Sequence, residues 1–190
     1  MARILIVLLS FLLAFLAAPA FSECRSAPSV WTEETGSNIV KFEDWVVARI
    51  AERNQCWLYS NPIKSTINNQ GASEEFCRGA SRLIINFLPS DSINGELSYE
   101  SGYHFDPSAK LFLKAETFTL DLLYQDSGIA WTSGGNDDES VISAFGSNQY
   151  VSLSGTAESS VQVNDIFSLS GFKEALQRAK VECGLIDLIS

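Results

Sequence analysis

Short apolar segments of strand length, separated by turn-forming residues, recur along the chain from residue 44 to residue 169. In the segment 117–124 (TFTLDLLY), apolar residues alternate with mostly polar ones, as in a strand with one face on a core and one face in water. Antiparallel sheets show this alternation, whereas parallel strands are usually apolar on both faces. Since the segments also do not alternate with helices, the sequence predicts a mainly β protein, an antiparallel β-sandwich or flattened barrel with two short α-helices.

The expected strands are 44–51, 56–59, 82–88, 96–101, 110–114, 117–124, 129–131, 149–155 and 161–169. One long polar stretch, 61–75, interrupts them, and its turn formers around Asn68 and Gly71 predict a mobile loop. Asp165 breaks the apolar side of the last strand. Six aromatic residues are expected to fill the core rather than line a ligand groove: Trp45, Trp57, Tyr59, Tyr103, Phe105 and Trp131.

Two short helices are expected in the second half of the chain. Asn136 is expected to cap the first, whose opening turn is the acidic run 137–139, because a helix N-terminus favours negative charge. A metal site at these acids is the less favoured alternative. The second helix is expected to begin at Gly171 and to end at the C-cap Gly184. Its apolar stripe consists of Phe172, Ala175, Leu176, Ala179 and Cys183.

The start of the chain has the pattern of a cleaved signal peptide. Arg3 supplies a positive charge, an uncharged apolar run follows, and Ala18-Pro19-Ala20 is a small-x-small cleavage site. Cleavage is expected after Ala20, with Ser22 as the alternative end. An uncleaved anchor is disfavoured, because a membrane span needs about 20 apolar residues and Pro19 interrupts the run. The predicted division is a signal peptide (1–20), an N-terminal arm (21–41), one β domain (42–184) and a C-terminal tail (185–190), with no stable membrane span in the mature form.

Four cysteines follow the expected cleavage site, namely Cys24, Cys56, Cys77 and Cys183. An even number of cysteines in an exported chain predicts two disulfides, and four cysteines allow three connectivities. If Cys56 pairs with Cys183, the second helix is tied to an early strand. Zinc binding is disfavoured, because no Cys-x-x-Cys pair occurs and the one histidine, His104, is distant in sequence.

The charge and the motifs exclude several functions. The sequence has 23 acidic against 13 basic residues, a formal net charge of −10, which argues against binding nucleic acid. His104 and Asp106 are the remaining candidates for an acid–base pair, but no nucleophile motif accompanies them. No phosphate-binding loop occurs either, so no catalytic residue, metal or cofactor is predicted.

A set of residues in the C-terminal third has a distinctive order and spacing. They are Gly155, Asp165, Phe167, Ser168, Leu169, Gly171, Phe172, Ala175, Leu176, Ala179 and Cys183. Supporting residues upstream are Trp45, Cys56, Trp57, Ser60, Pro62, Gly102, Tyr103, Phe105, Ala130 and Trp131. Over roughly residues 42–183 the chain resembles the invasion-associated locus B family of exported bacterial proteins. In physical terms, Phe167, Leu169 and Phe172 are expected in the core and Gly171 at a strand-to-helix corner, so the motif indicates fold rather than activity.

The resemblance implies a periplasmic or envelope protein, with outer-membrane association and secretion as alternative locations. It implies no enzymatic mechanism, and the family is named for a member linked to host-cell entry. The expected function is therefore non-enzymatic binding of an unidentified envelope or host protein. Two alternatives remain open: a periplasmic enzyme that uses His104 and Asp106, and a purely structural envelope or stress protein.

Overall fold

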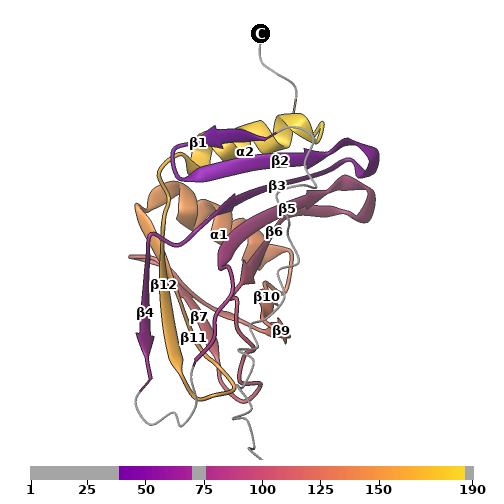
Figure 1. Ribbon diagram of the computed structural model, residues 1–190. Helices are drawn as coiled ribbons and strands as arrows, with labels where there is room; N and C mark the ends of the chain where they lie inside the picture. The colour runs from indigo at the N-terminus through magenta and orange to yellow at the C-terminus, as the bar shows by residue number, and fades with distance from the viewer. Residues whose placement is uncertain (1–38, 70–75, 187–190) are drawn as a thin grey trace, which may run out of the picture.

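The computed structural model describes residues 39–69 and 76–186 of the 190-residue chain, and these form two antiparallel β-sheets with two helices (Figure 1). Sheet A has seven strands in the order β1-β2-β3-β5-β6-β10-β9, and sheet B has five in the order β4-β12-β11-β7-β8. In Figure 1 β2 and β3 run across the view while β4 and β12 run from top to bottom, so the sheets cross steeply. The expected mainly β, sandwich-like architecture is confirmed.

The strands of sheet A are β1 (Val40–Phe42), β2 (Trp45–Ile50), β3 (Gln55–Ser60), β5 (Arg82–Leu88), β6 (Ile93–Glu100), β9 (Tyr124–Asp126) and β10 (Ile129–Trp131). Those of sheet B are β4 (Lys64–Asn68), β7 (Leu111–Lys114), β8 (Thr119–Leu122), β11 (Tyr150–Thr156) and β12 (Gln162–Ser168). The helices are α1 (Asn136–Ser147) and α2 (Phe172–Glu182), and short 3-10 turns follow β2 (Ala51–Arg53) and β5 (Pro89–Asp91). The first strand thus begins at Val40, two residues before the expected start of the domain.

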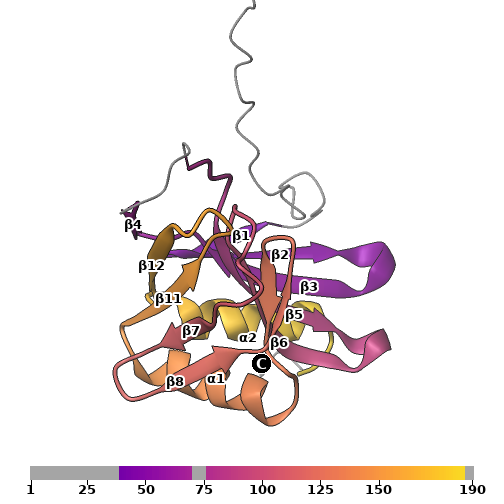
Figure 2. The same ribbon diagram turned by 90° about the horizontal axis from the view of Figure 1, so that it is seen from below.

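The core fills the space between the sheets and under the helices. α2 packs on β2 and β3, α1 packs on β6, and the two helices touch each other (Figure 2). Three aromatic rings join these elements: the ring centroid of Trp45 lies 5.1 Å from that of Phe172, which lies 5.3 Å from that of Phe145. The Trp45 indole also donates a hydrogen bond to the Ser168 carbonyl oxygen at 3.0 Å. The strand-to-helix segment 168–172 is therefore fixed directly against β2.

Both ends of α2 depend on glycine. Gly171 precedes the helix with a φ of +82°, and a Cβ atom there would lie 2.2 Å from the Phe42 carbonyl oxygen. At the other end the backbone N–H groups of Gly184 and Leu185 bond to the carbonyls of Val181 and Lys180, which is a Schellman motif. Gly171 thus stands at the strand-to-helix corner as expected, whereas the C-cap is Cys183 and Gly184 follows it with a φ of +67°. Leu185, in the predicted tail, packs against the core.

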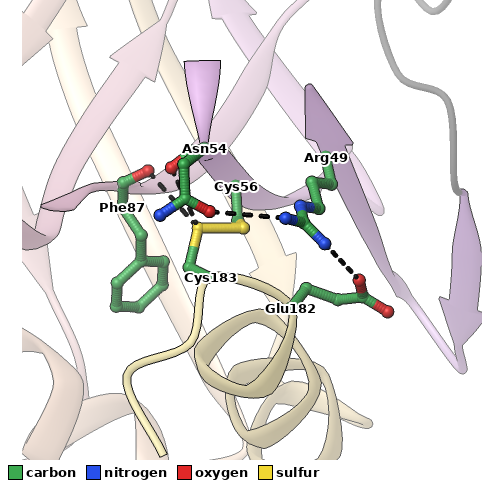
Figure 3. Close-up of a disulfide and its surroundings, with 6 residues drawn as sticks. All are labelled: Arg49, Asn54, Cys56, Phe87, Glu182 and Cys183. Carbon is green, nitrogen blue, oxygen red and sulfur yellow. Dashed lines mark hydrogen bonds and ion pairs between the residues drawn. A yellow bond between two sulfur atoms is a disulfide. The ribbon is translucent and has the colours of Figure 1, made fainter. Parts of the chain in front are cut away.

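A disulfide joins the C-terminal end of α2 to β3 (Figure 3). It links Cys56 to Cys183, 127 positions apart, with their Cα atoms 5.9 Å apart. Arg49 spans the same corner, since its guanidinium lies 3.6 Å from the Glu182 carboxylate and bonds to the Asn54 side chain at 3.4 Å (Figure 3). Cys77 is also disulfide-bonded, whereas Cys24 and the predicted signal peptide lie outside the described residues. The sequence left the connectivity open, and the structure selects the pair that pins α2.

The structure corrects three local expectations. The predicted loop 61–75 contains β4, which pairs with β12 from Lys64 to Asn68. Residues 70–75 lie outside the described residues. The predicted single strand 117–124 divides at Leu123: β8 pairs in sheet B and β9 pairs in sheet A. α1 begins at Asn136, so Asn136 is not its cap; Gly135 holds that position without a side-chain bond.

Most of the aromatic side chains expected in the core are buried. The buried ones are Trp45, Trp57, Tyr103 and Phe105, whereas Tyr59 and Trp131 are half-buried. Trp57 does not join the main core but packs with Ala48 and Ile84 in a smaller cluster, against which Tyr59 lies. The prediction of core positions is thus confirmed for the four buried residues.

Candidate binding site

The motif residue Asp165 faces inward from β12 and is fully buried. Its carboxylate forms an ion pair with Arg78 and accepts hydrogen bonds from the hydroxyls of Ser65 (2.7 Å), Ser81 (2.8 Å) and Tyr99 (2.7 Å). Since Ser65 lies on β4 and Tyr99 on β6, these bonds connect the edge of sheet B to sheet A. The sequence pattern showed that Asp165 breaks the apolar face of its strand. It did not identify the side chains that pair with the carboxylate and offset the cost of burying it.

The surroundings of Asp165 keep it ionised. Burial raises the pKa of its carboxyl, but the hydrogen bonds from Arg78, Ser65 and Tyr99 and the charge of Arg78 outweigh burial, so the pKa lies below its ordinary value of 3.8. Burial raises the pKa of the neighbouring Tyr99 and Tyr103 hydroxyls, which therefore stay protonated. The Asp165 carboxylate is buried, and its hydrogen bonds and ion pair are all made with other protein groups. We therefore interpret this cluster as a part of the scaffold and not as a ligand site.

The predicted acid–base candidates do not form a pair. The Asp106 carboxylate accepts hydrogen bonds from the backbone N–H (2.8 Å) and the hydroxyl (2.7 Å) of Ser108, and these bonds lower its pKa. The His104 carbonyl accepts a bond from the backbone N–H of Glu158. No bond between the side chains of His104 and Asp106 occurs in the described part of the chain. The structure therefore provides no dyad at this bend.

The acidic run at the start of α1 has structural partners. Asp138 turns inward, where its carboxylate accepts hydrogen bonds from the Leu97 backbone N–H (3.3 Å) and the Thr132 hydroxyl. Asp137 accepts a bond from the Ser133 hydroxyl. Within residues 39–69 and 76–186, no group of three or more His, Cys, Asp or Glu side chains is arranged to hold a metal ion. The acids thus attach α1 to sheet A.

The outer face of sheet B carries a different kind of chemistry. Apart from Asp165 and its partner Ser65, the inward positions of its strands are apolar. The alternate positions point outward, and the strand register aligns them in rows. The central row runs across the sheet through Thr66, Asn164, Ser154, Phe112 and Asp121. The row on one side holds Asn68, Gln162 and Thr156, and the row on the other holds Lys64, Ile166, Ser152, Lys114 and Thr119. Hydroxyl and amide groups therefore dominate this face.

The face is hollowed into a groove of about 410 Å³, which we call the sheet B groove. Its lining residues are Thr66, Asn68, Lys110, Phe112, Ser154, Gly155, Thr156, Gln162, Val163 and Asn164. The Phe112 ring is 41% exposed at one side of it. Gly155 leaves space beneath the groove for the Tyr103 side chain, since a Cβ there would lie 2.8 Å from the Tyr103 hydroxyl oxygen. The groove is open to solvent and needs no rearrangement to admit a ligand.

The groove has a charge distribution unlike that of the whole chain. Among the side chains of the three rows and the groove lining, the charged ones are Lys64, Lys110, Lys114 and Asp121. Lys110 and Asp121 form an exposed ion pair at 2.9 Å, which raises the pKa of the lysine. The remaining two lysines give this face a local positive charge in a chain whose net charge is −10.

The sequence did not predict the sheet B groove. The alternation of polar residues in 150–156 and 162–168 was visible and indicated a solvent-facing side. What the sequence could not provide was the neighbour relation, because β4, β7 and the consecutive pair β11 and β12 come from three distant parts of the chain. β4 in particular was expected to be a loop, so that Thr66 and Asn68 had no assigned face.

A second hollow, of about 460 Å³, lies beside α2 and is lined by Phe42, Lys173, Glu174, Gln177, Arg178 and Val181. Its charges of both signs are spaced along one helix face, and Arg178 already pairs with Glu182. Charged groups at such spacing are typical of a solvated helix surface. We therefore take the sheet B groove as the candidate binding site.

Fold and groove together define a disulfide-bonded antiparallel β-sandwich with an open, polar sheet face. No helix in the described residues has both the length and the apolar character needed to cross a membrane. Comparison with known proteins gave no match: no family model, no curated protein and no solved structure is significantly similar to the chain.

Proposed function

We propose that the protein is an exported, non-enzymatic binding protein of the invasion-associated locus B type, which acts in the periplasm or at the envelope. It binds an envelope or host component through the sheet B groove. The observation that carries this proposal is the groove itself, an exposed row of hydroxyl and amide groups next to an exposed aromatic ring. Such groups on an open face are suited to holding a ligand.

One further observation supports the export step, and another bears on the family resemblance. The disulfide between Cys56 and Cys183 is of the kind that forms in oxidising compartments such as the periplasm. The residues that carry the family resemblance also have structural roles: Phe167 and Phe172 are buried, and Gly171 forms the corner before α2. The resemblance therefore concerns the scaffold, and the binding chemistry lies on side chains outside the motif.

The proposal is tested by site-specific photocrosslinking in the living bacterium. The photoreactive residue p-benzoylphenylalanine replaces Phe112 in the groove in one variant and Leu123 in the other. Leu123 is 67% exposed and is absent from the groove lining, so it is a matched surface control. We expect illumination to give a discrete, saturable adduct from position 112 and none from position 123.

The double substitution Thr66→Ala and Asn164→Ala in the position 112 variant should remove the adduct, because it strips polar groups from the centre of the groove. Equal crosslinking from both positions would contradict a specific site. Absence of any adduct from position 112, with the protein folded and exported, would favour the purely structural role.

A further inference from the structure

The ligand class can be inferred from the groove, an inference that rests on the proposed function. We propose that the sheet B groove binds a linear glycan that carries carboxylate groups, laid across the strands along the central row. The argument has three parts: the kind of polar group present, the spacing of the rows and the charge at the margins.

The polar groups are neutral and bifunctional. The groove lining includes the hydroxyls of Thr66, Ser154 and Thr156 and the amides of Asn68, Gln162 and Asn164. Hydroxyl and amide side chains both donate and accept hydrogen bonds, as sugar hydroxyls do. No arginine, the residue suited to bidentate binding of phosphate, is among the lining residues.

One of these groups is already oriented. The Ser154 hydroxyl donates to the Asn164 side-chain oxygen at 2.6 Å, which fixes the plane of the amide. In the part of the chain that the structure describes, the Asn164 amide nitrogen has no acceptor. Its two N–H groups therefore remain for a ligand hydroxyl or carboxylate, and little side-chain entropy is lost when they bind.

The geometry of the sheet suits an elongated ligand. Neighbouring strands lie about 4.8 Å apart, so the path from Thr66 on β4 to Phe112 on β7 is about 14 Å long, enough for a short run of sugar rings. The Phe112 ring stands at the end of this path. The C–H face of a sugar ring packs on an aromatic face, which gives the glycan an apolar contact that a run of hydroxyls alone would not provide.

The charge selects an acidic glycan over a neutral one. Lys64 and Lys114 flank the central row on β4 and β7, whereas Lys110 is paired with Asp121. Although the net charge of −10 repels anions at long range, each of these two lysines attracts a carboxylate at short range. The two lysines are exposed and strengthen binding in a salt-dependent way.

The test uses the full chain exported with its disulfides intact and ¹⁵N-labelled for NMR titration. Three probes are compared: an alginate hexasaccharide, which is linear and carries a carboxylate on each sugar; a dextran hexasaccharide, which is neutral; and poly-glutamate, which is acidic without sugars. We expect alginate to shift amides of β7, β11 and β12 and to bind at least tenfold more tightly than either control probe. Raising the salt concentration should weaken the binding of alginate.

Variants assign the binding to the groove. Phe112→Ala and Asn164→Ala should each weaken alginate binding at least tenfold, Phe112→Tyr should retain it, and Leu123→Ala should leave it unchanged. Replacing Lys64 and Lys114 by glutamine should lower both the affinity and its salt dependence. Because Phe112 and Asn164 are not part of the buried core, both variants should remain folded, which the unfolding curve checks.

Equal binding of poly-glutamate and alginate would reduce the site to charge attraction and overturn the glycan assignment. So would tight alginate binding that survives both Phe112→Ala and Asn164→Ala. If no oligosaccharide binds but position 112 still crosslinks a protease-sensitive adduct in the envelope, the glycan inference is wrong while the proposed binding function stands. If position 112 gives no adduct either, both are wrong.

Discussion

Arg78 and Asp165, 87 positions apart in the sequence, form an ion pair in which the Asp165 side chain is fully buried and the Arg78 side chain is 12% exposed. The arginine also donates to the Ser101 carbonyl oxygen at 2.8 Å and lies over the Tyr103 ring, 5.6 Å from its centroid. The pair thus binds β12 of sheet B to the segment between β4 and β5 and to the end of β6. Removing either partner leaves the other charge in the interior.

We expect Arg78→Met and Asp165→Leu, made singly, to lower the free energy of unfolding by about 3–5 kcal/mol each, because each leaves a buried group without its partner. The double variant should cost less than the sum, since no unpaired charge remains. Urea unfolding measures all three. Asp121→Asn, in the exposed pair with Lys110, is the control and should change stability little. Additive losses in the double variant would contradict the pairing.

The same pair predicts how stability depends on pH. The folded-state pKa of Asp165 lies below the ordinary value of 3.8, so its contribution to stability is complete above that value. It is lost as the pH falls through the lower, folded-state pKa. In urea unfolding from pH 6 to pH 2, the stability difference between wild type and Asp165→Asn should therefore be constant above about pH 5 and shrink below pH 4. A difference that grows with acidity would refute this.

The disulfide between Cys56 and Cys183 closes a loop of 127 positions. In the chain-entropy model a loop of this length stabilises the fold by about 4–5 kcal/mol. We expect Cys56→Ala with Cys183→Ala to lower the free energy of unfolding by roughly this amount, while Arg49 and Glu182 still hold α2 in place in the native state. Urea unfolding under non-reducing conditions measures it. An unchanged urea midpoint would show that removing the disulfide does not increase the conformational entropy of the unfolded chain.

Cys77 is disulfide-bonded, and Cys56 and Cys183 are joined to each other. Since the sequence has four cysteines, we expect the partner of Cys77 to be Cys24. Peptide mapping of the purified protein without reduction should recover one peptide pair that contains Cys24 and Cys77. Single substitution of Cys24 by serine should expose one reactive thiol at Cys77. Recovery of a dimer linked through Cys77 would contradict the intrachain pairing.

Gly171 and Gly184 have similar positive φ values but different neighbours. A Cβ at Gly184 meets nothing within 4 Å, whereas one at Gly171 meets the Phe42 backbone. We expect Gly184→Ala to cost about 1 kcal/mol for the left-handed conformation alone, and Gly171→Ala to cost about 3 kcal/mol because β1 must also move. Thermal unfolding of both variants gives the comparison. Equal costs would show that β1 yields freely at this contact.

Several elements were predictable because local chemistry determines them. Residues 82–88 form β5 as expected, since a short apolar run between turn formers has few alternatives. The helix after Gly171 has an apolar stripe and a glycine at each end, and it too was predicted. Where the pattern is local and strongly periodic, the sequence was sufficient.

The failures arise where distant partners decide the outcome. Lys64–Asn68 is exposed throughout and has no apolar face to mark it as a strand, yet pairing with β12 makes it one. The segment expected as one strand at 117–124 has a continuous alternation, but Thr119–Leu122 pair in sheet B whereas Tyr124 begins a strand of sheet A. The groove depends on the local alternation of side chains and also on the pairing of distant strands, because its rows exist only once β4 and β7 are placed beside β12 and β11.

The bond between Cys56 and Cys183 makes the intervening chain a closed covalent ring. That ring contains β4 to β12 and α2, and therefore every strand of sheet B and every side chain that lines the groove. A single proteolytic cut in any loop within the ring cannot release a fragment, because the two pieces stay attached through the sulfur bridge. Where proteases are present, a nicked molecule would thus keep sheet B and its groove assembled after an unbridged sandwich had come apart.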